Sequence, residues 1–327
     1  MWDTLSCKHQ ETDTLLKSIR PTSIPTQQCK PKNTQNQEKK NMKTRIITLL
    51  AALTALTTAS ATLIFEEYFH PDDFEANDSN LANGTNWGGG TNQLRFVDTV
   101  NLSFSNANYN PQGNADTGAA RTNASEANGR GSYTTVSGTA LSGEFWFSAL
   151  HQRNVNDTVD SYSIFNLGTV NSIEPTNTSF NTSTSFGLHN EGSTLRPFIA
   201  TGNASTWSAP TTGSATADIT YLFLARGNTT TNSLDVWIFE ESDTIPLTAG
   251  DLGAPTVSTS SALLSDVTTL WIGKRGNTGG TTYFDALRLS TLSGDAGLEA
   301  VTVIPEPGTL MLLGIALGAL ALFHRRK

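Results

Sequence analysis

The sequence predicts an all-β protein built as a two-sheet antiparallel sandwich. Runs of β-branched and aromatic residues alternate with segments rich in Asn, Gly, Ser and Thr, a pattern typical of strands separated by turns. No stretch of comparable length in the body of the chain carries a helical period. Charged residues make up 15% of the chain against a typical ~25%, which is the composition of an extracellular β-protein with long polar loops.

Residues 42–61 have the layout of a signal peptide with a helical apolar part. Met42-Lys43-Thr44-Arg45 is a basic start, residues 46–56 are apolar, and cleavage is expected at the small residues Ala59 and Ala61. Thr62 then becomes the first residue of the exported chain. The simplest interpretation of residues 1–41, which are polar and rich in lysine, is a spurious, disordered extension before the true start at Met42. An unusually long leader is the alternative.

The only two cysteines, Cys7 and Cys29, lie before Met42. The exported protein would therefore be free of cysteine. Neither a disulfide framework nor a cysteine metal site is available to it.

Residues 62–304 form the exported body, which is long enough for one large sandwich and does not require two domains. Nine basic residues stand against twenty-four acidic ones there, a net charge of −15. Nucleic acid and anionic lipid are therefore poor candidates for partners.

Eleven strands are expected in this body, each a β-branched or aromatic run bounded by turn residues. They cover residues 63–69, 93–104, 132–136, 143–150, 161–167, 185–189, 196–200, 219–226, 233–240, 269–275 and 282–289. Polar segments at residues 105–131, 201–216 and 248–261 are expected to be loops. Eleven strands without helices favour two antiparallel sheets packed face to face.

Several of these strands resemble the concanavalin A-like, laminin-G-like jelly roll, and the resemblance covers nearly all of the exported body. It is carried by the order and spacing of residues 143–148 (GEFWFS), 186–188 (FGL), 221–226 (YLFLAR), 234–238 (LDVWI) and 283–289 (YFDALRL). The resemblance implies a jelly-roll sandwich. Members of this fold include lectins, adhesion modules and glycosidases, so the fold alone leaves function open.

Catalytic motifs are missing from the exported body. The jelly-roll glycosidases carry their two catalytic glutamates in the motif E-x-D-x-x-E, and the sequence has no such motif. Glu240 and Glu241 come nearest, but adjacent residues on a strand point to opposite faces. A G-x-S-x-G elbow and an H-E-x-x-H motif are also absent from the sequence. We expect a protein that is not an enzyme and needs no cofactor.

A calcium site is the one cofactor alternative that the sequence leaves open. Asp72, Asp73 and Asp78 crowd the segment after the first strand, and oxygen ligands from loops suit Ca²⁺. The segment does not follow the EF-hand pattern, and solvated acidic loops are also expected at this net charge.

Trp146, Trp237 and Trp271 are the candidates for stacking on sugar rings. In the strand at 234–239, Leu234, Val236 and Ile238 share one face while Asp235, Trp237 and Phe239 share the other. The strand is thus apolar on both sides. The second face either forms a concave ligand surface or is covered by a loop or a short third sheet, and we favour the cover.

Residues 305–327 combine three features at the end of the chain. Pro305, Glu306 and Pro307 are followed by an uncharged apolar run from Thr309 to Phe323 and then by a basic end, Arg325, Arg326 and Lys327. The run predicts a single transmembrane helix, and the cations beyond it should stay cytoplasmic. Its fifteen residues span only ~22 Å of a ~30 Å bilayer core, so it is marginal as a permanent anchor.

This tail resembles the PEP-CTERM sorting tail of Gram-negative bacteria. In that family an exosortase, a membrane protease-transferase, handles the tail near the PEP motif. The resemblance implies an inner-membrane intermediate during export, followed by the cell surface or the extracellular matrix. A short helix suits a segment that is removed.

Three functions remain open from the sequence. The first is a non-enzymatic surface or matrix protein associated with exopolysaccharide or biofilm. The second is a lectin-like module that binds carbohydrate on its tryptophan-bearing face. The third is an unrecognised polysaccharide hydrolase, which the missing motifs disfavour.

Overall fold

The computed structural model describes most of the exported body, within one compact unit, Ser60–Lys327. The described residues are 63–70, 72, 74, 87–88, 94–98, 100, 102–109, 118–122, 130–154, 161–171, 177–191, 194–203, 214–276 and 280–302. The predicted extension, signal peptide and sorting tail (1–41, 42–61 and 305–327) lie outside these residues.

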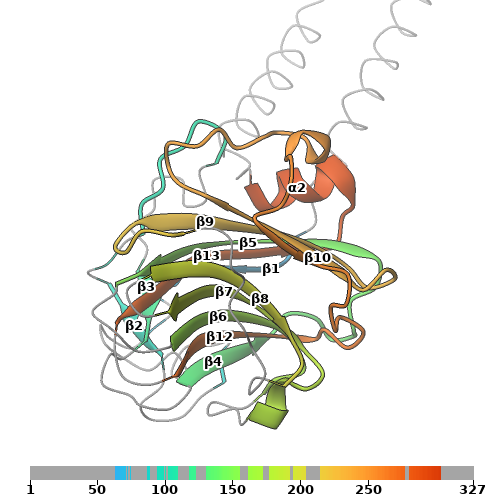
Figure 1. The fold of residues 1–327 in the computed structure, drawn as a ribbon, viewed down its shortest axis with the longest axis horizontal. Coiled ribbons are helices and arrows are strands. Elements are labelled where there is room, and N and C mark those ends of the chain that lie inside the picture. The colour runs from blue at the N-terminus through green and yellow to red at the C-terminus, as the bar shows by residue number, and fades with distance from the viewer. Residues whose placement is uncertain are drawn as a thin grey trace, which may run out of the picture. The chain divides into compact units, whose positions relative to one another are not determined.

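Two antiparallel sheets form the body, and the larger has eight strands in the order β11-β10-β9-β5-β13-β3-β2, with β1 also paired to β13. Figure 1 shows this sheet above the smaller one. Its strands are β1 Leu63–Glu67, β2 Arg95–Val97, β3 Ala119–Arg121, β5 Glu144–Arg153, β9 Thr220–Asn228, β10 Ser233–Phe239, β11 Val257–Thr259 and β13 Thr282–Ser290.

The smaller sheet has five strands in the order β4-β12-β6-β7-β8. They are β4 Arg130–Thr135, β6 Ser161–Gly168, β7 Thr184–Glu191, β8 Thr194–Thr201 and β12 Thr269–Gly276. Short 3₁₀ turns are present at η3 Asn177–Phe180 and η5 Ala249–Asp251. The two-sheet antiparallel sandwich expected from the sequence is confirmed.

The main core lies between the sheets and is dominated by aromatic side chains. Alternate residues of β5 enter it, because successive side chains of a strand point to opposite faces. Phe147 packs its ring at 5.4 Å from Phe165 of β6 and at 5.7 Å from Phe186 of β7. Both contacts are edge-to-face, the geometry that aromatic quadrupoles favour.

Strand β13 contains a β-bulge that changes which side chains face the core. Its pairing with β5 shifts register between Asp285 and Arg288, and Ala286 between them has φ +49°. Phe284 and Leu287 both enter the inter-sheet core, while Ala286 packs on the other side of the sheet. The extra residue thus keeps both apolar side chains inside.

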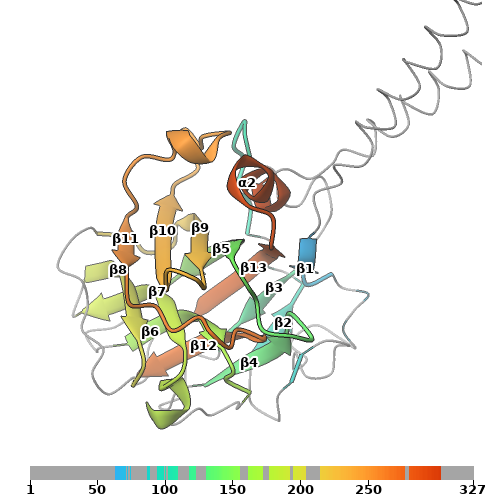
Figure 2. The same ribbon diagram turned by 90° about the vertical axis from the view of Figure 1, so that its right-hand side faces the viewer.

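The outer face of the large sheet is also covered, by a helix and loop segments. Helix α2, Gly294–Thr302, lies on the side away from the smaller sheet, as Figures 1 and 2 both show. Leu298 and Val301 of α2 are buried with Leu224 of β9. The protein therefore has a third, partial layer.

The expectation of a body without helices was therefore wrong. Helix α2 forms because Leu298 and Val301, three residues apart, share one side of a short helix and bury it against the sheet. Nine residues are too few for a helical period to stand out in the sequence.

Other boundaries also differ from those expected. Among the described residues of the strand predicted at 93–104, Arg95–Val97 form β2, while Leu102 and Phe104 pack as loop residues on the outer face of the large sheet. Strands β3 and β11 lie inside segments predicted to be loops. Each has only three residues, too few to show alternation in the sequence.

Candidate functional site

The site best defined by the structure is the junction between α2 and the outer face of the large sheet, directly before residue 303. Here we call it the α2 junction: Glu144, Trp146 and Ser148 of β5, Arg226 of β9, Trp237 of β10, and α2 itself. Alternate residues of β5 project here because Phe145, Phe147 and Ala149 between them face the main core.

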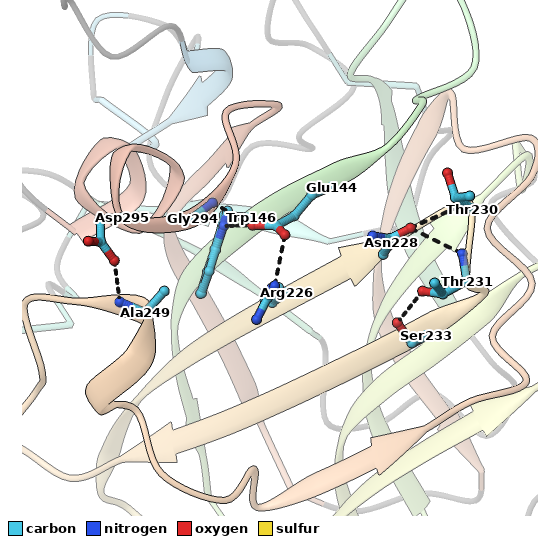
Figure 3. Close-up of polar contacts among 10 residues, drawn as sticks. All are labelled: Glu144, Trp146, Arg226, Asn228, Thr230, Thr231, Ser233, Ala249, Gly294 and Asp295. Carbon is cyan, nitrogen blue, oxygen red and sulfur yellow. Dashed lines mark hydrogen bonds and ion pairs between the residues drawn. The ribbon is translucent and has the colours of Figure 1, made fainter.

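Glu144 receives three hydrogen bonds at the start of α2 (Figure 3). The Gly294 amide donates to Oε1 at 2.6 Å, and the Trp146 indole Nε1–H donates to the same oxygen at 2.9 Å. The Arg226 guanidinium donates to Oε2 at 2.9 Å. Burial alone would raise the pKa of Glu144, but these hydrogen bonds outweigh it and lower the pKa below its ordinary value.

Arg226 links three strands on this face. Its guanidinium lies 5.7 Å from the ring centroid of Trp146, a cation–π distance, and is also paired with Glu144. Arg226 is opposite Asp235 of β10 in the strand register. Burial raises the pKa of Asp235, and the positive charge of Arg226 opposes that rise.

Two tryptophans form the floor of the junction. The rings of Trp146 and Trp237 are stacked with centroids 6.3 Å apart and planes inclined by 18°. Both pack in one cluster with Leu298 and Val301 of α2. The indole N–H of Trp237 donates to the Gly253 carbonyl at 3.2 Å.

The C-terminal end of α2 is held by a second contact to β5. The Ser148 hydroxyl, which is fully buried, donates to the Val301 carbonyl at 2.7 Å. That carbonyl belongs to the last turn of the helix, where no amide further along the helix is left to donate to it. Within the helix, the Thr302 hydroxyl donates to the Leu298 carbonyl at 2.7 Å.

The N-terminal end has a third attachment, to η5. The Asp295 carboxylate accepts a hydrogen bond from the Ala249 amide at 2.7 Å (Figure 3). An acidic residue in the first helical turn also interacts favourably with the helix dipole. Both ends of α2 are therefore tied to the body, and its polar contacts serve to hold the helix in place.

The three tryptophans predicted for sugar stacking are divided between the two sheets. Trp146 and Trp237 meet at the α2 junction, whereas Trp271 lies on the outer face of the smaller sheet, edge-to-face with Phe180 at 5.7 Å. Trp146 and Trp271 are 0% exposed and Trp237 is 6% exposed. All three rings are thus packed inside the protein, whereas stacking on a sugar needs a ring with a free face. The cover consists of helix α2 together with the segment that contains Leu252 and Gly253, so the expected loop forms part of it.

The alternation predicted for β10 is confirmed: Leu234 and Val236 face the main core, and Trp237 faces the other way.

Of the residues predicted for calcium, only Asp72 lies within the described residues. The backbone amide of Asp72 donates a hydrogen bond to His70 Nδ1 at 3.3 Å, and the Asp72 side chain is 91% exposed. Asp73 and Asp78 lie outside the described residues. Within the described part of the chain, no group of three or more His, Cys, Asp or Glu side chains is placed to hold a metal ion.

The predicted cleavage residues Ala59 and Ala61, the motif Pro305, Glu306 and Pro307, the run from Thr309 to Phe323, and Arg325, Arg326 and Lys327 also lie outside the described residues. Among the helices that the structure describes, none has both the length and the apolar character needed to cross a bilayer.

The junction residues Glu144, Ser148, Arg226 and Gly294 were not predicted from the sequence. The one available signal was the series Gly294-Asp295, Leu298 and Val301, which combines an acidic first turn with apolar residues three apart. The partners on β5 and β9 are distant in sequence and carry no local signal.

Comparison with solved structures finds similar backbones at low identity. Lectin II from Ulex europaeus is 11% identical, with 53% of this chain and 86% of that chain covered and a TM-score of 0.35. The T. cruzi calreticulin globular domain is 13% identical, with 81% and 100% covered and a TM-score of 0.41. The Emp47p carbohydrate recognition domain is 10% identical, with 62% and 99% covered and a TM-score of 0.35. Nothing about the ligands or activity of this chain follows from these likenesses.

No curated protein matches the sequence. The C-terminal segment does match a protein family. Residues 303–327, which begin directly after α2, match the family described as the PEP-CTERM protein-sorting motif. The chain therefore carries a PEP-CTERM protein-sorting motif, which implies export and processing by an exosortase.

Proposed function

We propose that this is a non-enzymatic protein of the cell surface or extracellular matrix, retained there in association with exopolysaccharide. The observation that carries the proposal is the sorting motif at residues 303–327, which follows the folded body without a linker. The body supplies a compact, cysteine-free sandwich that needs no redox machinery outside the cell.

The acidic, polar body supports an extracellular partner that is neither nucleic acid nor anionic lipid. Neutral or weakly charged polysaccharide is compatible with a body rich in Ser, Thr and Asn. The α2 junction supports a scaffold role, because its charged and aromatic groups are used to hold the protein together.

The sorting part is tested by fractionating native host cells and detecting the protein with an antiserum against residues 62–304. The parent protein should lose its tail, as measured by intact mass, and appear in the surface fraction. Glu306→Ala should remain full-length in the inner membrane, because the Pro-Glu-Pro triplet loses its one charged group while membrane insertion hardly changes. Parent protein that stays full-length in the inner membrane would contradict the proposal.

The polysaccharide part needs a second experiment. In a strain unable to make exopolysaccharide, the processed protein should appear in the medium instead of the surface fraction. Retention on such cells would point to a different partner. Turnover of any polysaccharide by the purified protein would show that it is an enzyme.

A further inference from the structure

Helix α2 determines how far the sorting motif lies from the folded body. Strand β13 ends at Ser290, and α2 continues the folded part to Thr302. Pro305 is three residues beyond Thr302 and so lies within about 11 Å of it. If α2 left the sheet and unfolded, fifteen residues would separate Ser290 from Pro305, a reach of about 50 Å.

Leaving the sheet and unfolding are one event for this helix. It has nine residues, two of them glycines, whereas isolated helices shorter than about 12 residues are marginal in water. Its helical state therefore depends on burying Leu298 and Val301 and on the contacts from β5.

Those contacts fix both ends of the helix through its backbone. Glu144 holds the Gly294 amide, and Ser148 holds the Val301 carbonyl. Val301 is two residues before the sorting motif begins at 303. The second contact therefore lies at the place where the folded body gives way to the motif.

We propose that α2 is a clasp whose release is required before the membrane enzyme can take the sorting motif. Proteins that recognise a peptide by its backbone bind it in extended form, and a folded segment must open locally before it is cut. With α2 docked, only Val303 and Ile304 separate the clasp from Pro305. The inference rests on the proposed processing of the tail.

The first test locks the clasp with a disulfide in the full-length protein. Ser148→Cys together with Val301→Cys places two thiols at buried positions where β5 contacts α2, and the exported chain has no competing cysteine. Tail removal in the native host should slow at least tenfold and recover on addition of a membrane-permeant reductant. The two single-cysteine variants are the controls, and thiol labelling confirms that the bridge has formed.

A flexible insertion tests whether the disulfide acts by keeping the sorting motif close to the folded body or in some other way. Twelve Gly and Ser residues placed between Thr302 and Val303 of the locked protein restore the reach that an open clasp would supply. Processing of this variant should return to near the parent rate while the disulfide stays intact.

The second test opens the clasp and does not depend on the disulfide. Leu298→Ser removes a fully buried side chain of α2 and should speed tail removal at least threefold. Glu299→Ser changes an exposed residue of the same helix and should leave the rate unchanged.

The outcomes separate the two proposals. If the parent protein keeps its tail, the proposed sorting function fails. If the parent is processed but the verified locked variant is processed equally fast, the clasp is refuted. An unchanged rate for Leu298→Ser refutes it as well, even if the disulfide fails to form.

Discussion

The indole ring of Trp146 occupies the space that a β-carbon on Gly297 would need. An ideal Cβ at Gly297 would lie 2.2 Å from Trp146 Cδ1 and 2.2 Å from the Leu292 carbonyl oxygen. The absence of a side chain at Gly297 thus lets α2 approach the large sheet closely enough to cover its aromatic face.

Gly297→Ala should weaken the docking of α2. Alanine is about 1 kcal/mol better than glycine inside a helix, so propensity alone predicts stabilisation. The clash with a backbone oxygen and a packed indole should instead make the substitution destabilising, since overpacking costs about 1–3 kcal/mol. Hydrogen exchange of residues 294–302 measures the effect. Gly250→Ala, where an added Cβ meets nothing within 4 Å, is the control, and slower exchange in Gly297→Ala would contradict the prediction.

Glu144→Gln should loosen the start of α2. The carboxylate accepts from Gly294, Trp146 and Arg226, and hydrogen bonds to charged groups are worth about 1.5–3 kcal/mol, so we expect a loss of about 1–2 kcal/mol. Because the pKa of Glu144 is lowered in the folded protein, its contribution is present above its ordinary value of 4.5 and is lost as the pH falls below it. Tryptophan fluorescence of the parent should change in that range.

The same acid titration of Glu144→Gln should lack this component of the change. Glu299→Gln, at an exposed position of the same helix, is the matched control and should show the same fluorescence change as the parent. An identical acid transition in all three proteins would show that Glu144 does not hold the helix.

His151→Phe should stabilise the protein in acid. His151 is fully buried in the main core, with its ring 5.2 Å from those of Phe223 and Phe284, and neither ring nitrogen has a hydrogen-bond partner. Burial, reinforced by the nearby positive charge of Arg153, lowers the pKa of His151 from 6.5 to about 3. The neutral form is thus favoured in the folded state, and stability is lost as the pH falls from 6.5 toward 3.

At pH 5 this linkage amounts to about 2 kcal/mol, which the phenylalanine variant should recover. Denaturant unfolding at pH 5 and pH 8 measures it, and the gain should be smaller at pH 8. A gain that does not depend on pH would show that packing, and not titration, is responsible.

Trp146→Ala and Trp271→Ala should lower the free energy of unfolding by similar amounts but differ in their effect on helix α2. Each removes a fully buried indole, which typically costs about 3–5 kcal/mol. Only Trp146 lies beneath α2, so only its replacement should also expose residues 294–302 to rapid hydrogen exchange. Equal exchange of α2 in the two variants would contradict the assignment of Trp146 to the junction.

The sequence was sufficient to predict the strands whose alternation is long and apolar. Residues 143–150 and 219–226 are such runs, and they correspond to β5 and β9 at the centre of the large sheet. Strands β3 and β11 were missed because three residues provide too little alternation to separate a strand from a loop.

The α2 junction was harder to predict from the sequence than the fold. The apolar second face of β10 indicated that something covers Trp237, but the covering helix is specified mainly by its partners on β5 and β9. Two glycines within its nine residues lower the helix propensity, and Gly297 is required by the ring of Trp146. Only the assembled sheet reveals that requirement.

The pairing of β1 with β13 also affects the order of events during export. Leu63 pairs with Ser290, so the first strand after the predicted signal peptide is completed by the last strand of the body. Such distant pairing is slow to form and cannot precede the arrival of β13 outside the membrane. The large sheet therefore closes only when translocation has come within thirteen residues of the sorting motif at 303. Folding of the body and recognition of the tail thus become possible at nearly the same stage of translocation.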